Sequence, residues 1–197
     1  MVSSTPVTGV KDGRVWRIGD DAEVSWIRDG TSITRAITSA VPPVFEAYAT
    51  LELPGHWEEQ EGSHDAAIIQ LLTAHTTSQP WWLGYLDTGS DDVVFTDAPR
   101  ITLYAGWPYV LVEAGPQQAA SWRLRDAWKS GRGSLPDVMF PSDRSWLVST
   151  LWDDDWTCIG GRAPLIADLL GDPELAPRAR QVELDDDDAT PPGHQAR

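Results

Sequence analysis

Residues 141–170 read PSDRSWLVSTLWDDDWTCIGGRAPLIADLL, and the most informative structural pattern of the sequence lies here. Residues 145–152 carry mostly apolar side chains on both faces at a period of two, which is typical of an inner strand covered on both sides. Three aspartates at 153–155 interrupt the run, and residues 156–159 resume a β-prone pattern. The stretch therefore predicts an antiparallel hairpin with an acidic turn.

A helix signal follows the hairpin directly. Gly160-Gly161 permits a turn, and Pro164 is tolerated in the first turn of a helix, where its missing N–H costs nothing. Apolar residues then follow at helical spacing, namely Leu165, Ile166, Leu169 and Leu170. We therefore expect the second strand of the hairpin to lead straight into a helix.

The rest of the chain predicts short strands and helices. Strand patterns occupy residues 14–18, 23–27, 44–53, 81–86, 93–95, 101–104 and 109–113, with a further edge strand allowed at 179–184. Helix patterns occupy residues 33–40, 64–75 and 115–128, the last exposing Arg123, and residues 130–141 are expected to form a loop. We expect a single α+β domain over residues 1–175, with a mainly antiparallel sheet of roughly six to eight strands and about four helices packed on it. Residues 176–197 are expected to form an acidic, flexible tail.

The motifs of the central stretch resemble those of a group of uncharacterised actinobacterial proteins. The shared pattern is P-x-D-R-x-W at 141–146, D-x-D-x-T-x-x-G-G at 153–161 and L-I-x-x-L-L at 165–170. Weaker matches lie at 41–48 and at His75-Thr76. The chain departs from the pattern at Trp156, where the group has a small residue, and in its extra Asp154. No activity is known for the group, so the resemblance implies one continuous domain and no particular chemistry.

Length and composition are those of one soluble globular domain. The chain has 197 residues, of which 41% are hydrophobic and 23% charged. No segment approaches the ~18–20 consecutive apolar residues of a membrane-spanning helix. The first residues also lack the basic and apolar regions of a secretory signal. We therefore expect a cytoplasmic protein that does not associate with membranes.

The net charge of −15 decides which partners are expected. A protein this acidic repels phosphate backbones, so nucleic-acid binding is not expected, whereas basic partners are attracted over long range. The leading hypothesis is an acidic interaction protein, such as an immunity or antitoxin-type factor, that binds a basic protein partner. The alternative is that the acidity only keeps the protein soluble.

Eleven tryptophans stand out in a chain of this length. A buried indole contributes a large apolar area, so most of them are expected in the core. Tryptophans that remain exposed are expected to anchor an interface or to form a stacking site.

The candidate site lies in and around the acidic turn of the central stretch. Its partner- or ligand-facing candidates are Arg144, Trp152, Asp153, Asp154, Asp155 and Trp156. The three aspartates suit a solvated turn, a partner-facing patch or a divalent cation, although the glycine of a calcium loop is missing. Arg144 is expected to form an ion pair with Asp153 or Asp155, and the alternative is a ligand clamp.

No catalytic residue, metal or cofactor is predicted. Cys158, the single cysteine, is expected to be buried and inert. His56 and His64 belong to an acidic loop without the spacing of a metal motif, and His75 is expected to be a packed or hydrogen-bonded core residue.

Two further hypotheses about function stay open beside the interaction protein. One is an enzyme or small-ligand-binding protein with a tryptophan-lined cleft flanked by Asp153, Asp155 and Arg144. The other is a structural component of a larger assembly.

Overall fold

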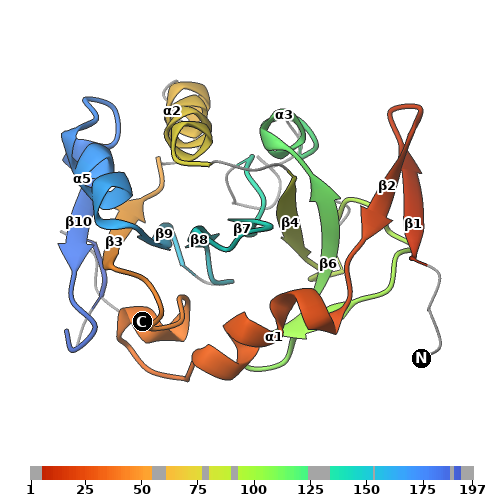
Figure 1. The fold of residues 1–197 in the computed structure, drawn as a ribbon, viewed down its shortest axis with the longest axis horizontal. Helices are drawn as coiled ribbons and strands as arrows, with labels where there is room; N and C mark the ends of the chain where they lie inside the picture. The colour runs from red at the N-terminus through yellow and green to blue at the C-terminus, as the bar shows by residue number, and fades with distance from the viewer. Residues whose placement is uncertain are drawn as a thin grey trace.

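In the part of the chain that the structure describes, ten strands form one sheet in which every pairing is antiparallel (Figure 1). The protein is represented by a computed structural model that describes residues 6–54, 61–76, 80–89, 93–123, 134–152, 154–186 and 189–191. Across the sheet the strands are β1 (Thr8–Lys11), β2 (Arg14–Ile18), β6 (Trp107–Ala114), β4 (Trp81–Leu86), β7 (Val138–Pro141), β8 (Trp146–Ser149), β9 (Trp156–Gly161), β3 (Ala47–Glu52) and β10 (Ala179–Val182), and β5 (Ile101–Leu103) pairs with β6 beside this path. The predicted fold class is confirmed, with more strands than expected.

Helices cover both faces of this sheet (Figure 1). On one face lie α2 (Glu61–Ala74), α3 (Pro116–Ala119) and α5 (Ala163–Gly171), and on the other lie α1 (Asp21–Gly30) and the 3-10 turn η1 (Ile37–Ser39). Each face has its own hydrophobic core, and Trp146 and Leu147 of β8 point into different ones. Both faces being covered explains why the inner strands are apolar throughout. None of the described helices has the length and apolar character that a membrane span requires.

The predicted hairpin is present as β8 and β9. Trp146 lies opposite Gly161, and Ser149 lies opposite Cys158. The glycine pair, however, belongs to β9 and is not a turn. A Cβ atom on Gly160 would lie 2.5 Å from Phe45 and 2.6 Å from Val41, and one on Gly161 would lie 2.5 Å from Leu165. These glycines are therefore required for close packing, and α5 begins immediately after them.

The strand predicted at 23–27 is wrong, because these residues belong to α1. Asp20 caps the helix by accepting a hydrogen bond of 2.8 Å from the Ala22 N–H, and Glu23 accepts one of 2.9 Å from the Asp20 N–H. This reciprocal arrangement is a capping box, which starts a helix by satisfying its first N–H groups. Val24 and Ile27 then bury the apolar side of the helix against the sheet.

Three further predictions on local structure are wrong. Only η1 forms within the predicted helix at 33–40, and residues 93–95 do not form a strand. Phe95 there has a φ of 62°, which a strand does not allow. The end of the predicted loop at 130–141 is instead β7, a fully buried strand between β4 and β8.

The C-terminal residues contribute to the domain. β10 pairs with β3 at the edge of the sheet, as the edge-strand pattern at 179–184 allows. The 3-10 turn η2 (Ala176–Arg178) precedes it, and Ala189 and Thr190 are buried. Arg180 donates a hydrogen bond of 2.9 Å to the carbonyl of Thr190. The domain boundary predicted after residue 175 is therefore placed too early.

Candidate functional site

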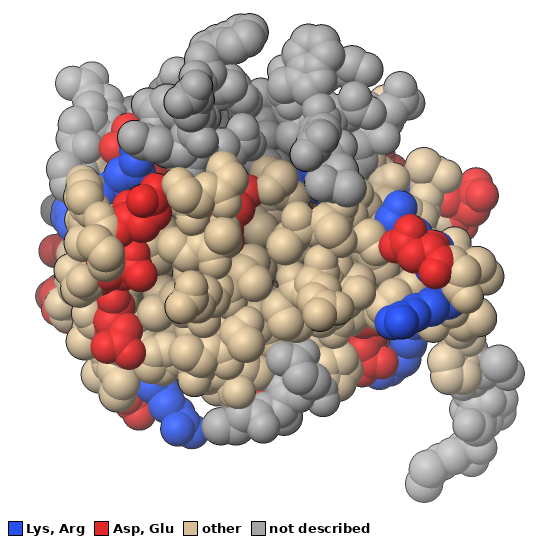
Figure 2. All heavy atoms as spheres, turned by 90° about the horizontal axis from the view of Figure 1, so that it is seen from above, with Lys and Arg blue, Asp and Glu red and all other residues tan. Residues whose placement is uncertain are grey.

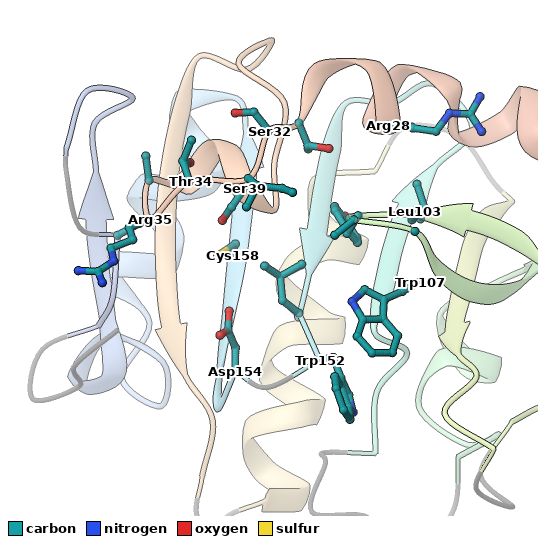
Figure 3. Close-up of a pocket in the computed structure, with 18 of the residues that line it drawn as sticks. Arg28, Ser32, Thr34, Arg35, Ser39, Leu103, Trp107, Trp152, Asp154 and Cys158 are labelled. Carbon is teal, nitrogen blue, oxygen red and sulfur yellow. The ribbon is translucent and has the colours of Figure 1, made fainter. Parts of the chain in front are cut away.

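A cavity of about 340 Å³ lies on the α1 side of the sheet, where several segments meet (Figure 3). The first segment is residues 31–39, which follow α1, include η1 and line the cavity in part, and Ala189 and Thr190 also contribute to the lining. The second is the turn between β5 and β6, and the third is the turn between β8 and β9. We call this cavity the tryptophan-rimmed pocket, because Trp107, Trp152 and Trp156 line it.

Large apolar side chains are exposed at this pocket. Trp107 is 37% exposed, Trp152 is 42% exposed and Ile33 is 88% exposed. The two indole rings lie side by side, with centroids 4.5 Å apart and an interplanar angle of 51° (Figure 3). Scattered apolar residues are ordinary on a protein surface, but neighbouring ones around a cavity mark a contact site.

The turn between β5 and β6 forms one wall of the pocket in a constrained conformation. Tyr104, Ala105 and Gly106 have φ values of 35°, 38° and 95°, and only glycine adopts such angles without cost. The Tyr104 hydroxyl donates to the Ala40 carbonyl at 3.0 Å and accepts from the Ser149 hydroxyl at 2.8 Å. These bonds hold the turn against the sheet and thereby fix the position of Trp107.

Cys158 of β9 lies deeper in the pocket and is buried, as predicted. Burial, and next the charge of Asp154, raises the pKa of its thiol above the ordinary value. Burial likewise raises the pKa of the Tyr104 hydroxyl. Both groups are therefore protonated at neutral pH, so neither can serve as a ready nucleophile or base.

The charged groups of the pocket are oriented differently from one another. Figure 3 shows the Asp154 carboxylate pointing into the pocket toward Cys158, whereas the guanidinium groups of Arg28 and Arg35 point away from it. Nη1 of Arg28 lies 3.1 Å from Oδ1 of Asp21, and Nε of Arg28 lies 3.8 Å from Oδ1 of Asp29. In the described lining, Asp154 is thus the charged side chain that points inward, while both arginines point outward.

The structure brings together only some of the predicted site residues. Trp152, Asp154 and Trp156 line the pocket, but Asp155 does not, and Asp153 lies outside the described residues. Arg144 is also elsewhere, with its guanidinium over the ring of Trp26 at 5.5 Å from the centroid. The predicted cleft thus has its tryptophans, but Asp155 and Arg144 do not flank it.

Sequence reasoning missed Ile33, Tyr104 and Trp107, because they come from segments far from the acidic turn. The Gly106-Trp107-Pro108 sequence marked a turn between strands. Nothing in that pattern indicated that the turn would meet Trp152.

A second polar cluster is buried on the opposite side of the sheet. Arg123 and Asp137 form an ion pair with both side chains buried, so the predicted exposure of Arg123 is wrong. Asp137 also accepts a hydrogen bond of 2.8 Å from the Leu86 N–H, and Arg123 lies over the ring of Tyr85. A cavity of about 40 Å³ adjoins the pair. The small cavity and the partners of the ion pair indicate a structural tie that joins the turn after α3 to β4 and to the residue before β7.

The histidines lie in different surroundings, and among the described residues no group of three or more histidine, cysteine or acidic side chains could hold a metal ion. His64 is buried within α2, and burial, followed by the charge of Arg178, lowers its pKa to about 4. His56 lies outside the described residues. The Nε2 atom of His75 lies 2.8 Å from Oδ2 of Asp168, so His75 is hydrogen-bonded, as one form of the prediction has it, but it is partly exposed and not in the core.

No protein-family model, curated protein or solved structure matches the chain. The resemblance of the central stretch to the actinobacterial group therefore stays a prediction. The pocket has to be interpreted from its own geometry.

Proposed function

We propose that this chain is a binding protein that holds a compact organic molecule in the tryptophan-rimmed pocket. The observation that carries the proposal is the exposed pair of Trp107 and Trp152 at a cavity of about 340 Å³. Small-molecule sites are generally cavities of roughly 300–1,000 Å³ with mainly apolar walls and a few placed polar groups. The pocket has this size, and its lining combines aromatic and aliphatic side chains with polar ones, several of which carry hydroxyl groups.

The chemistry of the pocket supports binding more than catalysis. In the part of the lining that the structure describes, Asp154 is the one carboxylate and no histidine is present. The raised pKa values of Cys158 and Tyr104 keep both groups neutral at neutral pH. Acid–base catalysis generally needs a pair of groups that titrate near the working pH.

A fluorescence titration tests the proposal, because indole emission reports on molecules that touch Trp107 and Trp152. A library of compact organic molecules is titrated into the wild-type protein and the Trp152→Ala variant. We expect binders whose Kd rises about tenfold or more in the variant, as is usual when an aromatic anchor is removed.

The matched control is Val10→Ala, which shortens an exposed apolar side chain of β1 that does not line the pocket. It should bind the same molecules with unchanged Kd. The proposal is wrong if no molecule of the library binds, or if Trp152→Ala binds as tightly as the wild type.

The net charge of −15 supports a second candidate function, an acidic interaction protein that binds a basic protein partner. Figure 2 shows the face that carries α2, α3 and α5, and acidic side chains gather along its α5 and β10 side. A pull-down at low and high salt tests this candidate. We expect a basic protein that is retained at low salt and released at high salt, equally by wild type and Trp152→Ala. Recovery of nothing at low salt would contradict it.

A further inference from the structure

Resting on the proposed function of the tryptophan-rimmed pocket, we infer that its ligand is a neutral sugar, whose ring face lies on the indoles of Trp107 and Trp152 and whose hydroxyl groups bond to residues 31–39. Three features of the described lining lead to this class of ligand. They are the exposed indole pair, the side chains that carry hydroxyl groups and the mixed signs of the charged side chains.

The indole pair offers an apolar surface on which a sugar ring can stack. Trp107 is 37% exposed and Trp152 is 42% exposed, and the centroids of the two rings lie 4.5 Å apart. A face of a pyranose ring carries C–H groups that are slightly positive, whereas the face of an indole carries negative potential. Stacking therefore buries apolar surface of both partners and leaves the hydroxyl groups at the edge of the sugar ring available for hydrogen bonds.

The segment of residues 31–39 supplies hydroxyl groups to the same pocket. Figure 3 shows Ser32, Thr34 and Ser39 on one side of the pocket and the two indoles on another. Within the part of the chain that the structure describes, the hydroxyls of Ser32 and Ser39 form no hydrogen bond, and that of Thr34 lies 3.4 Å from the hydroxyl of Thr38. A hydroxyl both donates and accepts and rotates to suit its partner. These side chains can therefore bond to the adjacent hydroxyl groups of a sugar, whereas an apolar ligand would displace their water and return no hydrogen bond.

The charged side chains of the lining favour an uncharged ligand, because both signs are present. Arg28, Arg35 and Asp154 line the pocket, and Arg28 is also paired with Asp21 and Asp29. A fixed charge on the ligand would be attracted by one sign and repelled by the other. Guanidinium and carboxylate groups can both form hydrogen bonds to neutral hydroxyl groups. The net charge of −15 further disfavours an anionic sugar derivative.

The experiment compares pyranose probes of similar shape in the full-length protein. The neutral probes are the methyl glycosides of glucose, galactose and mannose. The charged probes are the amino sugar and the uronic acid of each configuration, and 2-methoxytetrahydropyran keeps the ring and the methoxy group but has no hydroxyl. Binding is followed by tryptophan fluorescence and by calorimetry. We expect at least one neutral glycoside to bind about tenfold or more tightly than 2-methoxytetrahydropyran, and more tightly than its own charged derivatives.

Serine variants test whether the hydroxyl groups of the pocket recognise the sugar. Ser39→Ala and Ser32→Ala each remove one hydroxyl from the lining and should raise the Kd of the glycoside about three- to tenfold, with no change in the Kd of 2-methoxytetrahydropyran. Ser25→Ala removes a hydroxyl of α1 that does not line the pocket, so both Kd values should stay unchanged. Trp152→Ala should weaken the binding of both molecules, because both stack on the indoles. Thermal melts check that each variant is folded, and Ser32 is exposed, so its substitution leaves the core intact.

The outcomes distinguish this inference from the proposed function. The sugar inference would be overturned, with the pocket left intact, if 2-methoxytetrahydropyran or a charged derivative bound as tightly as the neutral glycosides. It would also be overturned if Ser39→Ala and Ser32→Ala bound the glycoside like Ser25→Ala. Binding of no glycoside, with binders still found in the library screen, would overturn the inference alone. Failure of both experiments would overturn the proposed function as well.

Discussion

Cys158 lines the tryptophan-rimmed pocket, yet its surroundings keep the thiol protonated. Burial contributes most to its raised pKa, and the Asp154 carboxylate adds to it. Because the thiolate is the reactive form, we expect alkylation by iodoacetamide at neutral pH to be about a hundredfold or more slower in the folded protein than in denaturant. Mass spectrometry of the alkylated protein over time measures both rates.

Asp154→Asn provides a control for the origin of this inertness. Removing the negative charge should increase the rate of alkylation in the folded protein, but only modestly, because burial remains. Rapid labelling of folded wild-type protein would show that the cysteine is accessible and would contradict the burial that the structure gives it.

The predicted site residues show how far local sequence can lead. Trp152, Asp154 and Trp156 could be predicted because they lie together around one turn. Arg144 lies close to them in sequence, but its φ of 57° and its contact with Trp26 turn it to another part of the surface. Residues that are close in sequence thus lie at the same site when they belong to one turn, but residues at opposite ends of a strand do not.

At the level of elements, β9 has glycines at 160 and 161 because neighbouring side chains leave little room for a Cβ atom. Gly160 has no positive φ, but a Cβ atom there would clash with Phe45 and Val41. We expect Gly160→Ala to lower the free energy of unfolding by about 1–3 kcal/mol, as is typical when a packed core is overfilled. Urea denaturation followed by circular dichroism measures the change.

Gly171, the last residue of α5, is the matched control. A Cβ atom at that position meets nothing within 4 Å. Gly171→Ala should therefore leave the stability unchanged or raise it by up to about 1 kcal/mol, since alanine is the better helix former. Equal losses from both substitutions would mean that crowding by Phe45 and Val41 is not the cause.

The elements that the sequence predicted well are those with long, consistent patterns. β8, β9 and α5 follow one another with apolar periodicity that leaves few alternatives. α1 was mistaken for a strand because Val24 and Trp26 alternate with polar residues, although the Asp20 to Glu23 capping box indicated a helix. The sequence does not predict β7, because a run of four apolar residues is too short to be assigned to a strand by itself. Its assignment depends on its pairing with β4 and β8, which the sequence does not show.

For the molecule as a whole, the pocket is assembled from segments about residues 31–39, 102–109 and 151–158, together with Ala189 and Thr190. β4 and β7 separate β6 from β8 in the sheet, yet the β5–β6 and β8–β9 turns meet through Trp107 and Trp152, and the 31–39 segment lines the same pocket. A single sequence carries no signal for such long-range pairing. The pocket could therefore be hypothesised from its tryptophans, but its walls could not be predicted.

Acid stability is a property of the whole molecule to which one buried histidine contributes. Burial, and next Arg178, lowers the pKa of His64 from 6.5 to about 4 in the folded state. In the unfolded chain the imidazole binds a proton below its ordinary pKa of 6.5, whereas the folded protein stays unprotonated until about pH 4. The contribution of neutral His64 to the free energy of unfolding is therefore complete above pH 6.5 and is lost as the pH falls toward 4. The loss amounts to about 3 kcal/mol at most.

His64→Leu should remove this part of the acid sensitivity. No partner for either ring nitrogen of His64 is found among the described residues, so leucine sacrifices no observed hydrogen bond. Urea denaturation across this pH range should show a smaller fall in unfolding free energy for His64→Leu than for the wild type. His75→Leu replaces a partly exposed histidine just after α2. This variant should keep the fall in unfolding free energy that protonation of His64 causes. Because both variants change the overall charge alike, an identical fall in all three proteins would mean that protonation of carboxylates, and not of His64, governs acid unfolding.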